Sequence, residues 1–242
     1  MESFLILGQP RSGTTYLQTL LNAHPDVHCR GELFDPWQID DDGQKTPGLE
    51  AVIARDADPE GFLDRRLAGE GLAGPLPVRI GAKVLFQHHP ALLARYIPAR
   101  PGLRLIHVRR ENKLAQFASM QQVAKTKRWT QTGAAGAAPQ IDVAPFWAAS
   151  ECNRLENEDF LMAAWLAGLP NPVFCVTYRG LFAPDFEGRV LAFLGVKRVG
   201  VLSTPLKKQG QDRILDRFVQ PGPIERYFGG TGRGDWLGAE LG

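Results

Sequence analysis

The sequence predicts an α/β fold of three layers, with a P-loop-like central parallel sheet flanked by helices. Apolar runs of strand length alternate with helical patterns along the 242 residues, and such alternation produces parallel strands joined by right-handed crossovers. The first apolar run passes through a glycine-bounded loop directly into a helical pattern. The chain is long enough for a large core, and no repeat or linker divides it, so we expect one domain over residues 1–242.

The first strand and helix flank a loop suited to an anion. Ser3–Gly8 is an apolar run typical of a buried central strand, and the helical pattern after the loop ends near Asn22. Gly8 and Gly13 permit a tight turn whose N–H groups point inward. We expect Ser12 to cap the helix, whose positive N-terminal end faces the same point.

The glycine spacing matches the nucleotide P-loop, G-x-x-x-x-G-K-[ST], but its lysine is missing. Thr14 occupies the lysine position, and Arg11 is the only cation in the loop. Kinases and ATPases use that lysine, with magnesium, to hold the γ-phosphate of ATP. The loop therefore indicates a phosphate-like anion other than this γ-phosphate.

The later elements continue the alternation of strands and helices. Strands are expected at 79–86, 103–108 and 172–178, and helices at 58–69, 90–96, 111–129, 145–168, 186–194 and 211–219. Residues 36–57 are acidic and contain Pro47-Gly48, which predicts a surface loop with a short helix. Residues 132–139 are rich in glycine and alanine, a composition typical of a connector. Ligands of parallel sheets bind beyond the carboxyl ends of the strands.

Two arginines follow the strand predicted at 103–108. Arg109 and Arg110 stand where a P-loop kinase needs an acidic residue to hold magnesium. We interpret this cationic strand end as a site for a second phosphate, which Ser119 on the next helix would join through its hydroxyl. The alternative for this pair is two solvated arginines.

Glu32 is the candidate general base. It lies in the loop 30–36, which we expect to return toward the carboxyl end of the first strand. A carboxylate at that place can take a proton from an attacking hydroxyl. The alternative is a surface glutamate paired with Arg30.

Composition sets further limits. A net charge of +2 gives no support for binding nucleic acid or membranes through bulk charge. Three widely spaced cysteines indicate reduced thiols, and no segment has the length of a membrane span or the pattern of a signal peptide, so we expect a cytoplasmic protein. The five histidines form no compact set with cysteines and carboxylates, so no metal site is expected.

Taken together, these motifs resemble the sulfotransferases that use 3′-phosphoadenosine 5′-phosphosulfate (PAPS), especially the bacterial branch with the Nod-factor and trehalose enzymes. The resemblance rests on Pro10-Arg11-Ser12-Gly13-Thr14-Thr15-Tyr16-Leu17, His24-Pro25, Gly31-Glu32-Leu33-Phe34, Gly81-Ala82-Lys83, Arg109-Arg110-Glu111-Asn112 with Gln116 and Ser119, residues 126–129, Val176-Thr177-Tyr178 and Lys208-Gln209. These segments cover most of the chain in the expected order. One departure is Arg179-Gly180 where the family has glutamate after the tyrosine.

The resemblance implies a set of residues that bind the donor: Arg11, Ser12, Gly13, Thr14, Thr15, Arg109, Arg110, Ser119, Lys208 and Gln209. The loop residues would cradle the 5′-phosphosulfate. One of the two arginines and Ser119 would hold the 3′-phosphate, and Lys208-Gln209 would close over the nucleotide. Glu32 would be the general base, and Arg11 would neutralise charge on the leaving phosphate. No metal would be needed.

The reaction implied is transfer of a sulfonate from PAPS to a hydroxyl of a small molecule, glycan or lipid, with release of adenosine 3′,5′-bisphosphate. Two alternatives remain: a P-loop kinase of a small metabolite, and a non-catalytic nucleotide-binding protein. Trp37, Trp129 and Trp147 are candidates for stacking on a sugar face of the acceptor.

Overall fold

The computed structural model describes residues 2–41, 43–129, 138–206 and 211–241. The chain forms two compact units, each assembled from separate segments. Unit 1 comprises Met1–Gln9, Gly13–Arg109 and Leu166–Thr204, and unit 2 comprises Pro10–Ser12, Arg110–Trp165 and Pro205–Gly242. Because the segments of the two units interleave along the sequence, neither unit is a continuous stretch of chain. The single domain over residues 1–242 stays a prediction.

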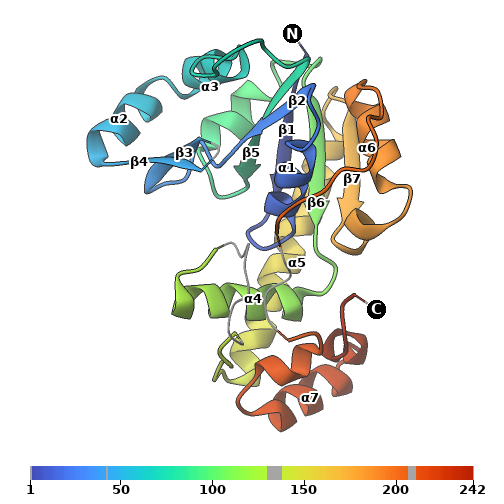
Figure 1. The fold of residues 1–242 in the computed structure, drawn as a ribbon. Helices are drawn as coiled ribbons and strands as arrows, with labels where there is room; N and C mark the ends of the chain where they lie inside the picture. Colours follow the sequence, from blue (N-terminus) through green and yellow to red (C-terminus); the bar gives the residue numbers. More distant parts are fainter. Residues whose placement is uncertain (1, 42, 130–137, 207–210, 242) are drawn as a thin grey trace. The chain divides into compact units, whose positions relative to one another are not determined.

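A five-stranded parallel sheet forms the centre of unit 1 (Figure 1). In spatial order its strands are β2 (Val27–Arg30), β5 (Arg79–Leu85), β1 (Glu2–Gly8), β6 (Arg104–Arg109) and β7 (Val173–Thr177). Strand β1 is central, because Phe4 pairs with Gly81 of β5 on one side and with Arg104 of β6 on the other. This position explains its continuous apolar run, since a central parallel strand is buried on both faces.

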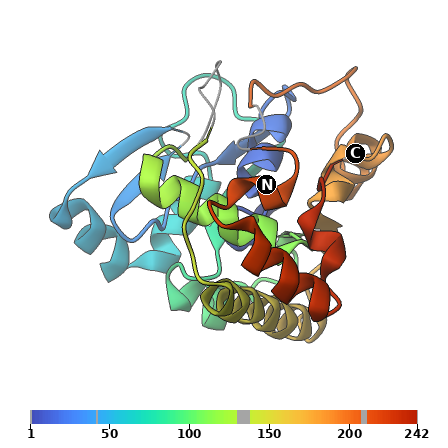
Figure 2. The ribbon, with the colours of Figure 1, turned by 90° about the horizontal axis from the view of Figure 1, so that it is seen from below.

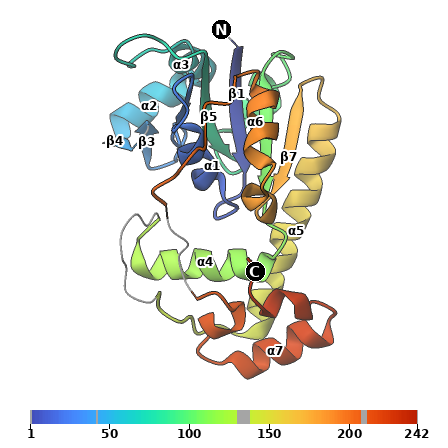
Figure 3. The ribbon, with the colours of Figure 1, turned by 45° about the vertical axis from the view of Figure 1, so that its right-hand side comes forward.

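Helices cover this sheet. The helices of unit 1 are α1 (Thr14–Leu21), α2 (Leu49–Ala57), α3 (Pro59–Leu67), the π-helix η1 (Leu92–Tyr96), the 3-10 turn η2 (Arg179–Phe182) and α6 (Phe186–Leu194). Helices α1 and α6 pack around Phe4 and Ile6, and Figure 3 shows both in front of the sheet. Leu5 and Leu7 point to the opposite face, because side chains alternate along a strand, and they are equally buried. The predicted α/β fold with a central parallel sheet flanked by helices is confirmed.

Two parts of unit 1 differ from the sequence-based expectation. Residues 36–57, expected as a loop with a short helix, form a hairpin of β3 (Gln38–Asp41) and β4 (Gln44–Pro47) followed by α2. The loop interpretation is therefore wrong for the hairpin and right for the helix. Strand β2 was not expected, because four residues that include a histidine and an arginine carry no apolar run.

Unit 2 is helical among its described residues. Its elements are α4 (Lys113–Thr126), α5 (Pro145–Ala167, whose last two residues belong to unit 1), α7 (Pro221–Gly230) and the single 3-10 turns η3 (Ile214–Arg217) and η4 (Gly234–Leu237). Its core contains Phe117 of α4, Leu155 of α5 and Phe228 of α7. Figure 2 shows α5 and α7 side by side, and the ring centroids of Phe146 and Tyr227 lie 5.8 Å apart between them. The helix expected at 211–219 is only the turn η3, and α7 was not expected.

Candidate active site

Gly13 is the residue at which the anion loop turns into α1. Its φ is 106°, and a Cβ atom there would lie 2.8 Å from Cδ1 of Leu181 and 2.9 Å from Cδ2 of Tyr178, so the position requires glycine. Gly13 is also the N-cap of α1, and therefore the expectation that Ser12 caps the helix is wrong. The Ser12 hydroxyl is instead buried and has no hydrogen-bond partner among the described residues. An unpaired buried hydroxyl is costly, so it marks a place where a ligand oxygen would be stabilised.

Arg11 is the cation of the loop. Its φ of 62° is unusual for a residue other than glycine. Its Nε donates a hydrogen bond to Oγ of Ser119 on α4 at 2.9 Å, and Nη1 donates to the Trp129 carbonyl at 2.6 Å. The sequence led us to expect Ser119 beside an arginine at the end of β6. The arginine that it contacts is Arg11.

The two arginines after β6 differ in their surroundings. Arg109 ends β6 and is exposed, whereas the Arg110 side chain is only 6% exposed. Arg110 forms a two-pronged ion pair with Glu240, with 2.7 Å between Nε and Oε1, and its Nη1 donates to the carbonyl of Arg11 at 3.0 Å. The guanidinium of Arg110 is thus committed to protein groups, while that of Arg109 faces solvent.

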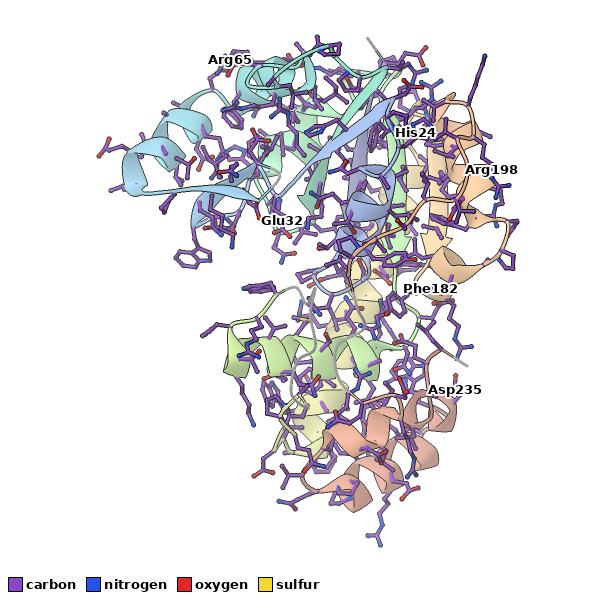
Figure 4. All side chains as sticks on the ribbon, viewed as in Figure 1. His24, Glu32, Arg65, Phe182, Arg198 and Asp235 are labelled. Atoms are coloured by element: carbon purple, nitrogen blue, oxygen red, sulfur yellow. The ribbon has the colours of Figure 1, made fainter. Side chains whose placement is uncertain are left out.

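Glu32 lies on the loop after β2, where Figure 4 labels it, and it meets two basic side chains of unit 1. Its Oε1 is 2.9 Å from Nζ of Lys83 in β5, and its Oε2 is 3.6 Å from Nε2 of His88. Nζ of Lys83 also donates to the Thr15 hydroxyl of α1 at 2.8 Å. One ammonium group therefore joins the candidate base to the anion loop.

The ionisation of Glu32 follows from these neighbours. Burial raises the pKa of its carboxyl, but the neighbouring His88 ring N–H and the charge of Lys83 outweigh burial and lower the pKa to about 2. Nδ1 of His88 accepts a hydrogen bond from the Leu85 N–H at 3.1 Å, which leaves the ring proton on Nε2, facing Glu32. The pairing with Arg30 considered from the sequence is absent among the described residues, because Arg30 pairs with Asp41.

A buried arginine holds the loop that carries Glu32. Arg55 of α2 is 3% exposed, and its Nη1 donates to the carbonyls of Leu33 at 3.0 Å and Asp35 at 2.8 Å. The same loop carries Trp37, whose side chain is 84% exposed. The loop held by Arg55 thus carries both the carboxylate of Glu32 and the exposed ring of Trp37.

Some predicted residues are placed by the structure and others are not. Lys208 and Gln209 lie outside the described residues. Lys83 and His88 were not predicted as site residues. Lys83 has a signal that could have found it, because it is a lysine within an apolar strand, and a buried lysine requires a partner.

Neither a metal centre nor a membrane span was found in the part of the chain that the structure describes. Across these residues, no three histidine, cysteine or acidic side chains are grouped so that they could hold a metal ion. None of the described helices is both long and apolar enough to cross a membrane.

Comparisons with known proteins bear on the family and the fold of the chain. A family model described as "Sulfotransferase family" matches residues 3–198. The chain is 27% identical to Nodulation protein H of Rhizobium meliloti (strain 1021), over 94% of this chain and 95% of that protein. It is also 27% identical to Nodulation protein H of Rhizobium tropici, over 95% and 90% of the respective chains. The crystal structure of a sulfotransferase from Alicyclobacillus acidocaldarius superposes with a TM-score of 0.53 at 17% identity, covering 95% of this chain and 96% of that one, which supports the fold.

Proposed function

Because the chain belongs to the sulfotransferase family, we propose that it uses PAPS to sulfonate a hydroxyl of an acceptor with a sugar-like face, with Glu32 as the general base. The predicted family is confirmed, and the 27% identity to Nodulation protein H supports the bacterial branch. The chain is a transferase enzyme, and enzymes of this family depend on PAPS. The kinase and the non-catalytic binding protein considered from the sequence are therefore set aside. The observation that carries the proposal is the Lys83 ammonium, which contacts both Glu32 and Thr15.

The donor is bound through its two anionic groups. The loop Arg11–Thr15 receives the phosphosulfate, a role supported by the unpaired Ser12 hydroxyl and by the N–H groups of the first turn of α1, which have no partner within the helix. Arg109 binds the 3′-phosphate, because its guanidinium is exposed while that of Arg110 is held by Glu240. Ser119 contributes through its hydrogen bond with Arg11. Lys208 and Gln209 are proposed to cover the nucleotide.

Transfer proceeds by in-line displacement at sulfur. The acceptor oxygen forms a bond to sulfur while its proton passes to a carboxylate oxygen of Glu32. The bond between sulfur and the bridging phosphate oxygen breaks, and its electron pair leaves with adenosine 3′,5′-bisphosphate. The cation of Arg11 and the loop N–H groups stabilise the charge that develops on this leaving oxygen.

Lys83 links donor binding to the strength of the base. A carboxylate whose pKa is about 2 is a weak base, and the charge of Lys83 contributes to that low value. The Lys83 ammonium donates a hydrogen bond to the Thr15 hydroxyl. A sulfonate bound beside Thr15 would therefore be a second anion close to this ammonium, in addition to Glu32. Sharing the ammonium with this anion raises the proton affinity of Glu32 once the donor is in place.

The acceptor carries a flat apolar face, as a sugar ring does. Trp37 supports this choice, because it follows Glu32 in the same loop and its ring is almost fully exposed. Trp129 is 59% exposed, whereas Trp147 packs edge-on against Phe117 of the core and is less suited to stacking. A cytoplasmic location remains part of the proposal and is supported by three cysteines that form no disulfide among the described residues.

The test is product formation. The protein is incubated with PAPS and a panel of glycans, lipids and phenols, and mass spectrometry is used to find an added sulfonate. We expect sulfonated glycan and equimolar adenosine 3′,5′-bisphosphate. The variant Trp37→Ala should raise the KM for the acceptor and leave the KM for PAPS unchanged. Product with phenols or lipids alone would overturn the acceptor class, and no product with any acceptor would overturn the proposed activity.

A further inference from the structure

The C-terminal tail carries a buried carboxylate, Glu240, that no part of the proposed chemistry uses. Its side chain is 2% exposed and pairs with Arg110, which is 6% exposed. Burying two charges costs free energy that a two-pronged pair offsets only in good geometry. Because such a pair adds little stability, we expect it to have a further role. The contacts of Arg110 indicate this role, because its third nitrogen, Nη1, donates a hydrogen bond to the carbonyl of Arg11 in the anion loop at 3.0 Å.

A second buried pair in unit 2 holds the neighbouring carbonyl. Lys113 of α4 pairs with Asp159 of α5 and donates to Oε1 of Gln116 at 3.2 Å. Nε2 of Gln116 then donates to the carbonyl of Pro10 at 2.8 Å. Two successive loop carbonyls are thus held by side chains that are themselves fixed by ion pairs.

Holding these carbonyls determines where the next N–H groups point. In a trans peptide the C=O of one residue and the N–H of the next lie in one plane and point in opposite directions. The bonds to the Pro10 and Arg11 carbonyls therefore turn the N–H groups of Arg11 and Ser12 to the other side of the loop. The positive φ of Arg11 shows that this conformation is strained and needs outside support.

We infer that Glu240 is a positioning residue: through Arg110 it fixes the backbone of the anion loop in the conformation that presents its N–H groups to the donor. The tail reaches this place through its own contacts within unit 2, since the Trp236 carbonyl accepts a hydrogen bond from Asn112 at 2.9 Å and Arg213 bridges to Ala239. The inference rests on the proposed function and adds to it a residue far from the loop in sequence.

The experiment separates positioning from stability. The double variant Arg110→Met with Glu240→Leu replaces the buried ion pair by apolar groups of similar volume, which proteins often tolerate, but it cannot donate to the Arg11 carbonyl. We expect a Tm close to that of the unmodified protein and an affinity for adenosine 3′,5′-bisphosphate that is weaker by about tenfold or more, because loop geometry is lost. The exposed pair Arg154→Met with Glu158→Leu on α5 is the matched control, and its affinity should not change.

Further measurements make each outcome decisive. Glu240→Asp keeps the charge and should restore most of the affinity lost in Glu240→Gln. Equal affinity of the double variant and the unmodified protein would overturn the inference. Failure of the double variant to fold would also overturn it, because the pair would then serve folding. If the unmodified protein does not bind adenosine 3′,5′-bisphosphate at all, the proposed function fails instead.

Discussion

Two loops carry the candidate chemistry, and a buried arginine holds the backbone of each. In unit 1, Arg55 donates to carbonyls of the loop that bears Glu32, and its carboxylate partner Asp56 is the next residue, 35% exposed. In unit 2, Arg110 donates to the anion loop, and its partner Glu240 is 130 residues away and almost fully buried. In both loops a buried guanidinium donates to backbone carbonyls. The two arrangements differ in whether the carboxylate that pairs with the arginine is adjacent in sequence or distant.

This difference separates a local device from a long-range one. An arginine whose carboxylate partner is adjacent and partly exposed needs only one helix and the neighbouring loop to be folded. If the ion pair is broken, water can solvate the exposed carboxylate. An arginine buried with a distant carboxylate depends on the C-terminal tail being folded. Substitutions that loosen the Glu32 loop should therefore change turnover and the KM for the acceptor. Substitutions that loosen the anion loop should weaken the binding of the donor.

The largest effect is expected at the base itself. Glu32→Gln should lower turnover by about 10²- to 10⁴-fold, because the proton of the acceptor loses its receiver. Affinity for adenosine 3′,5′-bisphosphate, measured by titration calorimetry, should stay within about twofold. Unchanged turnover would show that Glu32 is not the general base. It would also contradict the assignment of the Glu32 loop to the base and the acceptor.

A smaller loss is expected when the loop cation is removed. Arg11→Ala should weaken the binding of adenosine 3′,5′-bisphosphate by about 10- to 100-fold, the range for charged hydrogen bonds. Arg11→Lys keeps the charge without the planar contact to Ser119 and should lose less. Calorimetry that finds the Ala variant as tight as the unmodified protein would place the donor elsewhere.

Arg55→Gln tests the local device. Its loop carbonyls lose their donor, so we expect the free energy of unfolding to fall by about 2 kcal/mol and the KM for the acceptor to rise. Donor affinity should not change. The exposed Arg65→Gln, on α3, is the control and should shift unfolding by less than about 0.5 kcal/mol. A loss of donor affinity in Arg55→Gln would show that the two loops are not independent.

The last prediction concerns the dependence of stability on pH. The pKa of Glu32 is lowered from 4.5 to about 2, so its ionised form stabilises the folded protein above pH 4.5, and this contribution is lost as the pH falls toward about 2. Denaturant unfolding of the protein and of Glu32→Gln should therefore give free energies that converge over this window. A constant difference from pH 5 to pH 2 would mean that Lys83 and His88 do not hold the carboxylate in solution.

Much of unit 1 could be predicted from the sequence because its signals are local. The buried run Phe4–Leu7 and the glycines of the loop act within a few residues of where they stand. The capping role of Ser12 was wrong, because Gly13 itself takes the left-handed conformation at which α1 begins. Strand β2 carried no apolar run, and its place at the sheet is set by pairing with β5.

The rest depends on contacts between residues far apart in sequence. Nothing near Arg110 indicates that Glu240 neutralises it, so the two arginines after β6 could not be told apart. The prolines and glycines of residues 221–230 are typical of turns, yet this segment forms α7, because a proline at the first helical position is favourable and Ile224 and Phe228 pack in the core. Arg217 donates to the Gln211 carbonyl, and the helix expected there shortens to one turn.

The order of the strands has a consequence for how the protein folds during synthesis. The central strand β1 is made first, but its partners begin at Arg79 and Arg104, and the last strand, β7, begins at Val173. The apolar residues 4–7 therefore leave the ribosome long before anything can pair with them. Sheets closed by such distant pairings fold slowly and expose aggregation-prone intermediates. We expect the yield of soluble protein to rise when translation is slowed by cooling or when chaperones are co-expressed.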